Sequence, residues 1–350
     1  MPMPRTFTSA GAFIAASLVC LVLAGCASEA PPAPLPVAVV PRGAVAPPPV
    51  ALSGRVVEAA AEYRIYMDQA AKISPAFHNG PSIEEALTTA EGFEAQQLSR
   101  GAIAYGALVA LQDAGFVAGV RTYAVDPDGR RAMAQRIAAD PNYAAVLPGA
   151  SSAAGLIIAT LNADGTKVRT AGEMVKQSAY DVQHQAWSKG FVTDPAGRLA
   201  HAKSVSASSA PADPQALARL RDAVNGGDTK VASKVQLVSA TPSAPPYSPL
   251  VTRALAVAAL AALGEGGDDN DAQVSSLLNE SNGGFCLNMS KLNLYQCLAV
   301  AKPWYEDIFC LGQHVLVDTG TCIAKGAGKP NPTQMAAEPT AGPAAPGANK

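Results

Sequence analysis

Four Asp-Pro pairs are the feature that most constrains the fold of this chain. Asp is a good acceptor at a helix N-cap, and a following proline already has the φ angle of a first helical residue and needs no amide partner. Ser82, which follows Pro81, adds the capping-box spacing with Glu85. Each Asp-Pro pair stands before a helix-forming run and predicts a helix start, at Asp126, Asp140, Asp194 and Asp213.

Apolar residues at three- and four-residue spacing extend this helical pattern. The spacing predicts an amphipathic helix over about 53–72 and a long Ala-rich helix over about 96–123. Leu156–Leu161 and Val168–Trp187 mark two further helices. Leu250–Leu263 is apolar nearly all round, which predicts a buried core helix too short to cross a bilayer. Because convincing period-2 strands are absent from the sequence, the predicted fold class is all-α, a multi-helix bundle.

Low-complexity segments divide the chain. Pro-rich stretches cannot continue a helix or donate to a sheet, so they predict an extended tether and a linker. A C-terminal stretch of Gly, Ala and Pro predicts a disordered tail. The predicted parts are a leader over 1–25, a Pro-rich tether over 26–52, a helical domain over 53–224, a linker over 225–248, a helical segment with four cysteines over 249–326, and the tail over 327–350.

The N-terminus has the layout of a secretion signal. Arg5 supplies a short positive region, and the apolar run Gly11–Val22 is too short to span a bilayer. The run leads into Leu23-Ala24-Gly25-Cys26, which resembles the lipobox of bacterial lipoproteins: an aliphatic residue, two small residues and a cysteine. The resemblance implies cleavage before Cys26, a diacylglycerol on its thiol, and two or three acyl chains in all on Cys26, palmitate among them, which anchor the protein stably. An ordinary secretory signal cut near Ala24 is the alternative.

The residues after Cys26 indicate in which membrane the protein is expected to be anchored. In Gram-negative lipoproteins an Asp after the cysteine commonly retains the protein in the inner membrane, whereas Ala27 and Ser28 stand here. By this analogy we expect an outer-membrane anchor, with the domain facing the periplasm. The formal net charge is −2 and only 15% of the residues are charged, so no basic footprint points to nucleic acid. The expected partners are the membrane, through the lipid, and an envelope protein.

The remaining cysteines predict disulfides. Cys20 lies in the leader and Cys26 is the expected lipid acceptor. The four remaining cysteines are an even number, as expected for disulfide pairs in an oxidising compartment. A zinc site is the alternative, but it favours close C-x-x-C pairs, and the gaps here are ten residues or more. Two disulfides are therefore expected among Cys286, Cys297, Cys310 and Cys322.

The spacing of the four cysteines on helices favours one of the possible disulfide pairings. Cys286 and Cys297 are eleven positions apart, which returns almost to the same helix face, and Pro303 is suited to open a second helix after a short turn. A helical hairpin with nested bridges, Cys297–Cys310 and Cys286–Cys322, satisfies this geometry. Sequential pairing, Cys286–Cys297 with Cys310–Cys322, is the alternative. The plan is similar to the twin-cysteine helical hairpins of mitochondrial intermembrane-space proteins, with different spacings.

Motifs for catalysis or metal binding are not found in the sequence. The four histidines, His78, His184, His201 and His314, stand outside HExxH and HxH settings, and His314 can share a helix face with Asp318. Asp269 and Glu280 have the spacing of the first and last EF-hand ligands, but Val274 replaces the required glycine, which favours a solvated loop. We therefore expect no catalytic residue, metal or cofactor.

These observations favour a non-enzymatic envelope lipoprotein, a helical body on a Pro-rich tether that serves as a structural or protein-interaction module. Two alternatives remain. One is an enzyme acting on the cell wall or a small envelope metabolite, with a glutamate from the Glu84–Glu94 region, such as Glu91 or Glu94, as general acid. The other is a carrier of an apolar ligand between helices.

Overall fold

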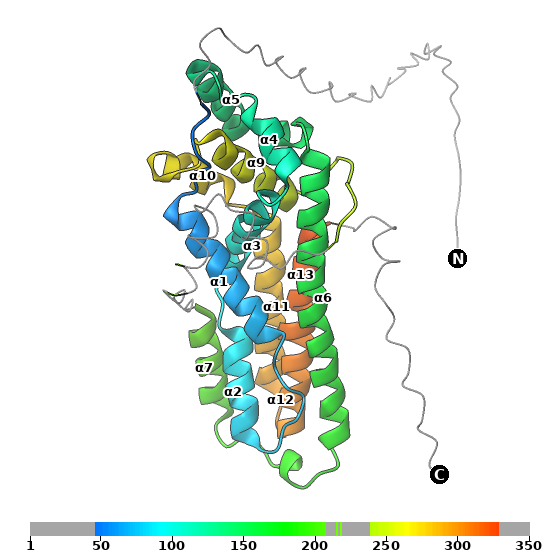
Figure 1. Ribbon diagram of the computed structural model, residues 1–350. Coiled ribbons are helices and arrows are strands. Elements are labelled where there is room, and N and C mark those ends of the chain that lie inside the picture. Colours follow the sequence, from blue (N-terminus) through cyan, green and yellow to red (C-terminus); the bar gives the residue numbers. More distant parts are fainter. Residues whose placement is uncertain (1–45, 208–214, 216–217, 219–238, 329–350) are drawn as a thin grey trace, which may run out of the picture. The chain divides into compact units, whose positions relative to one another are not determined.

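The computed structural model describes residues 46–207, 215, 218 and 239–328 (Figure 1). Apart from one isolated bridge between Phe191 and Pro303, this part of the chain contains no β-structure, so the all-α prediction is confirmed. The predicted leader, Cys26, and most of the tether, linker and tail lie outside the described residues. The α-helices are α1 (Gly54–Ala70), α2 (Gly80–Glu91), α3 (Ala95–Ala110), α4 (Ala114–Arg121), α5 (Pro127–Ala139), α6 (Ala150–Val182), α7 (Pro195–Ala207), α9 (Pro249–Leu263), α10 (Asp271–Leu277), α11 (Ser281–Val300), α12 (Trp304–Cys310) and α13 (Asp318–Ala327).

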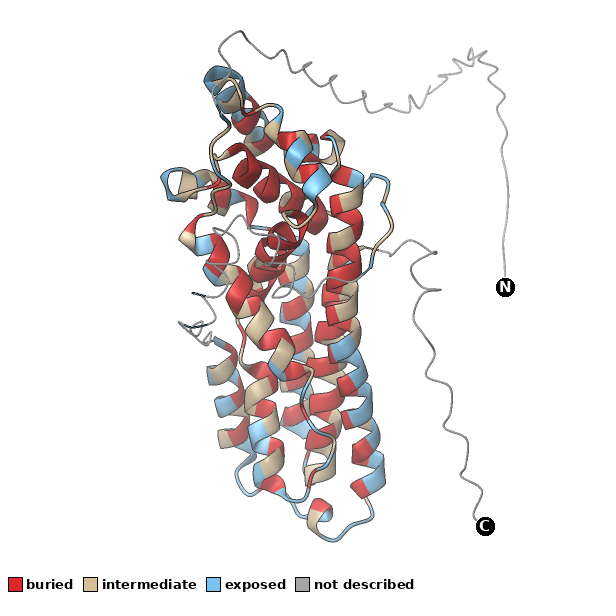
Figure 2. Ribbon diagram, in the orientation of Figure 1, coloured by how far each residue is buried: buried red, intermediate tan, exposed pale blue. Residues whose placement is uncertain are grey.

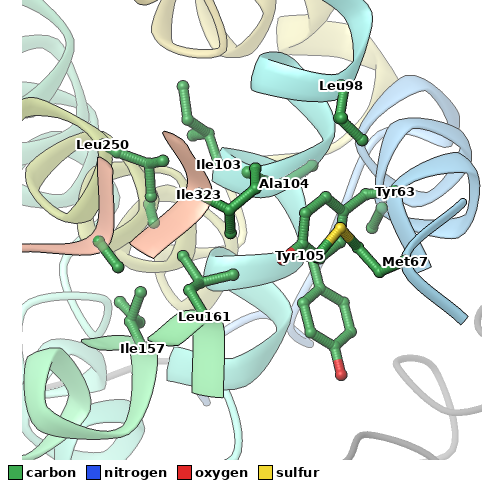
Figure 3. Packing of buried hydrophobic residues seen from close by; sticks show 14 of the residues in the cluster. Tyr63, Met67, Leu98, Ile103, Ala104, Tyr105, Ile157, Leu161, Leu250 and Ile323 are labelled. Atoms are coloured by element: carbon green, nitrogen blue, oxygen red, sulfur yellow. The ribbon is translucent and has the colours of Figure 1, made fainter. Parts of the chain in front are cut away.

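The core is built around α3 and α9, which are mostly buried along their length (Figure 2). Both helices are rich in alanine, and α9 is buried nearly all round, as its apolar sequence predicts. Helices from both sides of residues 208–238 contribute to one continuous apolar cluster. Figure 3 shows Ile103 of α3, Leu161 of α6, Leu250 of α9 and Ile323 of α13 in this cluster.

Helix α6 is continuous from Ala150 to Val182, where the sequence predicted two helices. Within the polar stretch between the two apolar segments, Asp164 is buried and has partners on α1. The Asp164 carboxylate accepts hydrogen bonds from Arg64 at 2.8 Å and Tyr63 at 3.3 Å, both from α1. Gly165 admits the backbone of α13, since a Cβ there would lie 2.5 Å from the Gly320 carbonyl oxygen.

The helix predicted over 96–123 is two helices, α3 and α4, whose axes are bent by 85°. Asp113 causes the break, because its side chain accepts a hydrogen bond from the Phe116 amide at 2.8 Å and starts α4 as an N-cap. Within the described residues, only this bent pair has the length and hydropathy required to cross a bilayer, and each single helix falls short.

Two of the four Asp-Pro pairs start α-helices as predicted. The side chains of Asp126 and Asp194 accept hydrogen bonds at 2.8 Å from amides in the first turns of α5 and α7. Asp140 caps a helix as predicted, but that helix is the short 3₁₀ segment Pro141–Val146. The helix start predicted at Asp213 lies outside the described residues.

The predicted capping box at Ser82 is wrong. The N-cap of α2 is Asn79, whose side-chain oxygen accepts a hydrogen bond from the Ser82 amide at 2.9 Å. Pro81 lies inside the first turn, where its missing N–H needs no partner. The helix therefore begins before the proline, and Ser82 is already part of it.

The C-terminal hairpin has the predicted arrangement. Helix α11 ends at Val300, and α12 starts directly after Pro303. Cys286 pairs with Cys322 and Cys297 with Cys310, each with 5.7 Å between Cα atoms, which is the nested connectivity. The second arm also contains a π-helical segment, Leu311–Val317, that the sequence did not predict.

Candidate pocket between α2 and α7

A cavity of about 470 Å³ lies between α2 and the segment that leads into α7. The Asn79 and Asp194 caps fix the N-terminal ends of the two helices that form its walls. At its mouth, the Thr88 hydroxyl lies 3.0 Å from the His201 imidazole Nε2 and links α2 to α7. The ionisable side chains that line the cavity are Glu84, Glu85, Glu91, Asp194, Arg198 and His201.

Glu91 forms part of the inner wall. It is the last residue of α2, and its side chain is fully buried. The Ser206 hydroxyl of α7 donates a hydrogen bond to Oε2 at 3.2 Å, whereas Oε1 has no hydrogen-bond partner among the described residues. Burial raises the pKa of the Glu91 carboxyl to about 7, against the opposing effects of the Lys291 charge and the Ser206 hydrogen bond. The carboxyl group therefore titrates near neutral pH.

Lys291 of α11 lies beside Glu91 and is 5% exposed. Its ammonium group donates to the backbone carbonyl of Glu91 at 3.0 Å and lies 3.7 Å from the centroid of the Phe93 ring, a cation–π contact. Burial lowers the pKa of Lys291 to about 8, and the neighbouring Glu91 charge opposes that shift. The protein thus holds two opposite ionisable groups inside the bundle.

Arg198 of α7 also lines the pocket, and its guanidinium group is anchored in the interior. Nη1 forms hydrogen bonds with both carboxylate oxygens of Asp307, at 2.7 Å to Oδ2, and Nη2 donates to the carbonyls of Leu298 and Ala301. Arg198 Nε has no hydrogen-bond partner within the described part of the chain. Burial raises the pKa of Asp307 to about 6, although the charge of Arg198 lowers it.

The pocket has an excess of negative charge. Glu84, Glu85 and Asp194 are exposed carboxylates at its rim, and Glu91 lies within it. The single guanidinium in the lining, Arg198, is already balanced by Asp307. A cation entering the pocket is therefore favoured by the surrounding field.

Glu94 and His314, which the sequence also singled out, do not line this pocket. Glu94 is the N-cap of α3, and its carboxylate accepts from the amides of Gln96 and Gln97 at 2.8 and 2.7 Å. His314 lies 3.3 Å from Asp318, on one helix face as predicted. The predicted lipidation site, Cys26, lies outside the described residues, and the four cysteines predicted to form disulfides cross-link the hairpin and do not line the pocket.

Two acidic side chains in the region with EF-hand spacing accept hydrogen bonds from backbone amides. Glu280 caps α11 by accepting from the amides of Asn282 and Gly283 at 2.8 and 2.7 Å. The neighbouring Asp268 accepts from the Gly54 amide at 2.7 Å. Among the described residues, no group of three or more His, Cys, Asp or Glu side chains is placed to hold a metal ion.

Sequence reasoning missed three residues of the site: Lys291, Arg198 and Asp307. Each is a charged residue within a helix whose neighbours are largely apolar or small, which is a weak signal of burial. The contacts themselves join residues about one hundred to two hundred positions apart, as in the 200-residue separation between Lys291 and Glu91. No spacing rule within one helix finds such a pair.

Comparison with known proteins gives no match: no family model fits the chain, and no curated protein or solved structure is significantly similar to it.

Proposed function

We propose that this chain is a lipid-anchored protein of the cell envelope that serves as a non-enzymatic structural or protein-interaction module. The observation that carries the proposal is the pair of nested disulfides, Cys286–Cys322 and Cys297–Cys310, in a chain whose N-terminus resembles a lipobox. Disulfides persist in oxidising compartments, and a lipidated cysteine belongs to the same side of the membrane. The two features therefore support the same location, outside the cytoplasm in the cell envelope.

The end of the Pro-rich segment is fastened to the helical body. Arg121 donates hydrogen bonds to the carbonyls of Pro47 and Pro48, at 3.2 and 2.7 Å, and the Ala51 amide donates to the Ala261 carbonyl of α9 at 3.1 Å. A force applied through a lipid on Cys26 would therefore reach the core through α4 and α9. This attachment suits an anchored module that bears load or holds a partner near the membrane.

The anchor is tested by metabolic labelling with a palmitate analogue in a Gram-negative host. We expect label on the wild-type protein and on Cys20→Ser, and none on Cys26→Ser, whose unprocessed leader also leaves it larger on a gel. Density-gradient separation of the two membranes is expected to place the labelled protein in the outer membrane. Label that persists in Cys26→Ser overturns the lipid anchor.

The interaction role is tested by crosslinking in intact cells. We expect the wild-type protein to enrich an envelope protein over a control lipoprotein that carries the same anchor. Cys286→Ser with Cys322→Ser removes the outer bridge and is expected to weaken this enrichment if the hairpin shapes the partner surface. Equal recovery from the control lipoprotein would argue against an interaction module.

A second candidate, an envelope enzyme, is favoured by one observation: the Glu91 carboxyl, with a pKa of about 7, lies in the wall of a cavity. A carboxylic acid of this pKa is suited to donate a proton near neutral pH. Glu94 is occupied as the cap of α3 and does not line this cavity. The expectation of an apolar-ligand carrier stays a prediction.

The enzymatic candidate is tested with purified full-length protein on intact cell-wall material. Glu91→Gln is expected to abolish any hydrolysis, while Glu173→Gln, an exposed residue of α6, leaves it unchanged. Activity that survives in Glu91→Gln removes Glu91 as the acid.

A further inference from the structure

We propose that the exposed side of α11 binds a second copy of this chain, in a dimer whose two α11 helices lie parallel against each other. The inference rests on the proposed role as a protein-interaction module and deepens it by naming the surface and the partner. Helix α11 is the first arm of the disulfide-linked hairpin. Two features of its exposed side carry the proposal: the heptad spacing of its apolar residues and its lack of charge.

Helix α11 has apolar side chains on its buried side and also on its exposed side. Phe285, Met289 and Leu292 are 67%, 39% and 49% exposed, and Val300 at the end of the helix is exposed as well. Of the seven large apolar side chains that are exposed in the described part of the chain, four therefore belong to this one helix. Such a concentration of exposed apolar residues is typical of a surface that binds another protein.

The exposed side of α11 has the heptad spacing of a coiled coil. Intervals of three and four residues alternate along it, which places its residues at successive a and d positions of a heptad. These exposed residues, here called the α11 stripe, are Asn282, Phe285, Met289, Leu292, Gln296 and Ala299. The α11 stripe is about 26 Å long. Polar residues lie on either side of its apolar middle, as in interfaces that have an apolar core and a polar rim.

The lack of charge on the exposed side favours a second copy as the partner. Lys291 is the one charged residue in α11, a helix that the structure describes throughout, and it is buried. The positions that flank the α11 stripe, such as Asn288 and Asn293, are also uncharged. Charges at these flanking positions select the partner in coiled coils, so an acidic or basic partner finds no counter-charge here, whereas a second copy meets no repulsion. By comparison, the exposed side of α6 carries the Arg169–Glu173 ion pair, as is usual for a helix that faces water.

The two polar a positions favour a parallel pair. In a parallel pair with two-fold symmetry, each residue of the α11 stripe faces its own copy, so the Gln296 amide faces the partner's Gln296. An amide carries both donors and an acceptor, so two facing amides can hydrogen-bond to each other, and Asn282 can do the same. Polar a positions of this kind specify the register and the oligomeric state of coiled coils. In an antiparallel pair with a positions facing d positions, Gln296 would face the apolar partner's Phe285.

The rest of the molecule is compatible with this arrangement. Helix α11 is already formed, because its buried side packs in the core and two disulfides link it to the second arm. Association therefore does not include the unfavourable step of nucleating a helix. A two-fold axis parallel to α11 also places equivalent points of both copies at the same height. The two Pro-rich segments, which Arg121 fastens at Pro47 and Pro48, then leave the dimer at one level, and both proposed anchors can reach one membrane.

Disulfide crosslinking in intact cells tests the parallel pair. Leu292→Cys places a thiol in the middle of the α11 stripe, and Ala299→Cys places one near its end. We expect both variants to run as dimers on a non-reducing gel, because each new thiol faces its own copy. Gln177→Cys, at an exposed position of α6, is the control and is expected to stay monomeric. Crosslinking of Leu292→Cys without Ala299→Cys overturns the parallel arrangement, and an adduct of another mass overturns the second copy as partner.

Light scattering of the purified full-length protein in detergent measures the same association without added thiols. We expect a mass of two copies for the wild type and a dimer dissociation constant at least about tenfold higher for Leu292→Glu, which buries two facing charges in the interface. Met174→Glu is the matched control: Met174 of α6 is also apolar and 49% exposed, so this variant is expected to dimerise as the wild type does. A monomeric wild type, or a folded Leu292→Glu that dimerises normally, overturns the proposal.

The results are distinguishable from those that test the proposed function. A monomer that still enriches another envelope protein overturns the dimer and leaves the interaction module supported. A dimer that carries no palmitate label supports the α11 stripe and overturns the lipid anchor. A monomeric wild type whose thermal transition falls in Leu292→Glu shows that the α11 stripe is covered by the same chain, which also overturns the dimer.

Discussion

Two parts of the helical body differ in how they are held together. Along α3 and α9 the buried side chains are almost all apolar or small, with many alanines, and the buried ion pair close to α3, Arg64–Asp164, is contributed by α1 and α6. Around α2, α7, α11 and α12 the interior also contains charged side chains, among them the Arg198–Asp307 ion pair and the Glu91–Lys291 neighbours. The first part gains stability from burial of apolar surface, which does not depend on pH. The second holds groups whose burial is favourable only while their partners are present.

The contrast indicates where function is expected. Apolar packing such as that of α9 has one purpose, which is stability. Buried charges add little net stability compared with a well-packed apolar core, so their presence beside a cavity points to binding or chemistry. Each prediction below changes one side of this comparison, and together they measure how different the two parts are.

Asp307→Ala is expected to have the largest effect. The variant leaves the guanidinium of Arg198 buried without its counter-charge, because Arg198 is only 8% exposed. Loss of one partner of a buried ion pair lowers the free energy of unfolding by about 3–5 kcal/mol. Urea denaturation of the full-length protein in detergent, followed by circular dichroism, measures this loss.

The double variant Arg198→Met with Asp307→Leu is the control for this prediction. It removes both charges and fills the space with apolar groups, so most of the lost stability should return. A double variant as unstable as Asp307→Ala would show that the ion pair itself stabilises the fold. That result would weaken the view that the buried charges are present for binding or chemistry.

Leu260→Ala tests the apolar part. Leu260 of α9 is fully buried, and its truncation removes apolar contact and leaves a cavity. We expect the free energy of unfolding to fall by about 3 kcal/mol. The fall should be the same at pH 5 and pH 8, since no ionisable group is involved. A loss that changes with pH would mean that the two parts are coupled.

The pH dependence of stability provides the third prediction. Burial raises the pKa of Glu91 from 4.5 to about 7, so the folded state binds that proton more tightly than the unfolded state does. Between about pH 5 and pH 7 the unfolded chain loses the proton first, and stability therefore falls as pH rises, by on the order of 2 kcal/mol. Above about pH 8 the lowered pKa of Lys291 acts in the opposite direction, and stability rises with pH.

Glu91→Gln isolates the contribution of Glu91. Asp307, with a pKa raised to about 6, adds a fall in the same direction at lower pH, so the difference between wild type and Glu91→Gln is the relevant quantity. We expect this difference to follow the titration of one group near pH 7 in urea denaturation series. A difference that is flat from pH 5 to pH 8 would mean that Glu91 is not buried as a titrating group.

The two parts also differ in how far the sequence predicted them. Leu250–Leu263 is apolar on every face, so its burial follows from the sequence alone, and the cysteine spacing with Pro303 led to the nested hairpin. These features depend on neighbours within one helix or one hairpin. Local chemistry is visible in a single sequence because the interacting residues lie at fixed spacings.

The pocket was not predictable in the same way. Glu91 was named as a candidate acid, but its burial depends on α7 and α11, which are distant in the sequence. The continuity of α6 through Asp164 likewise depends on Arg64 and Tyr63, about one hundred residues earlier. Tertiary partners decided both cases, and no local pattern in the sequence identifies them.

Substitutions at the helix caps are expected to have the smallest effects, and Asn79→Ala tests whether helix capping differs between the two parts. The Asn79 side chain caps α2 through the Ser82 amide at 2.9 Å, and Ser248 caps α9 through the Val251 amide at 3.2 Å. Each substitution by alanine removes one acceptor from a first turn, so both are expected to lower the free energy of unfolding by about 1 kcal/mol. Ser82→Ala keeps the amide that Asn79 binds, and it should have a smaller effect. Equal losses at Asn79 and Ser248 would show that the two parts differ in their buried charges and not in their local helix chemistry, whereas a larger loss at Ser82 than at Asn79 would restore the capping box that the sequence predicted.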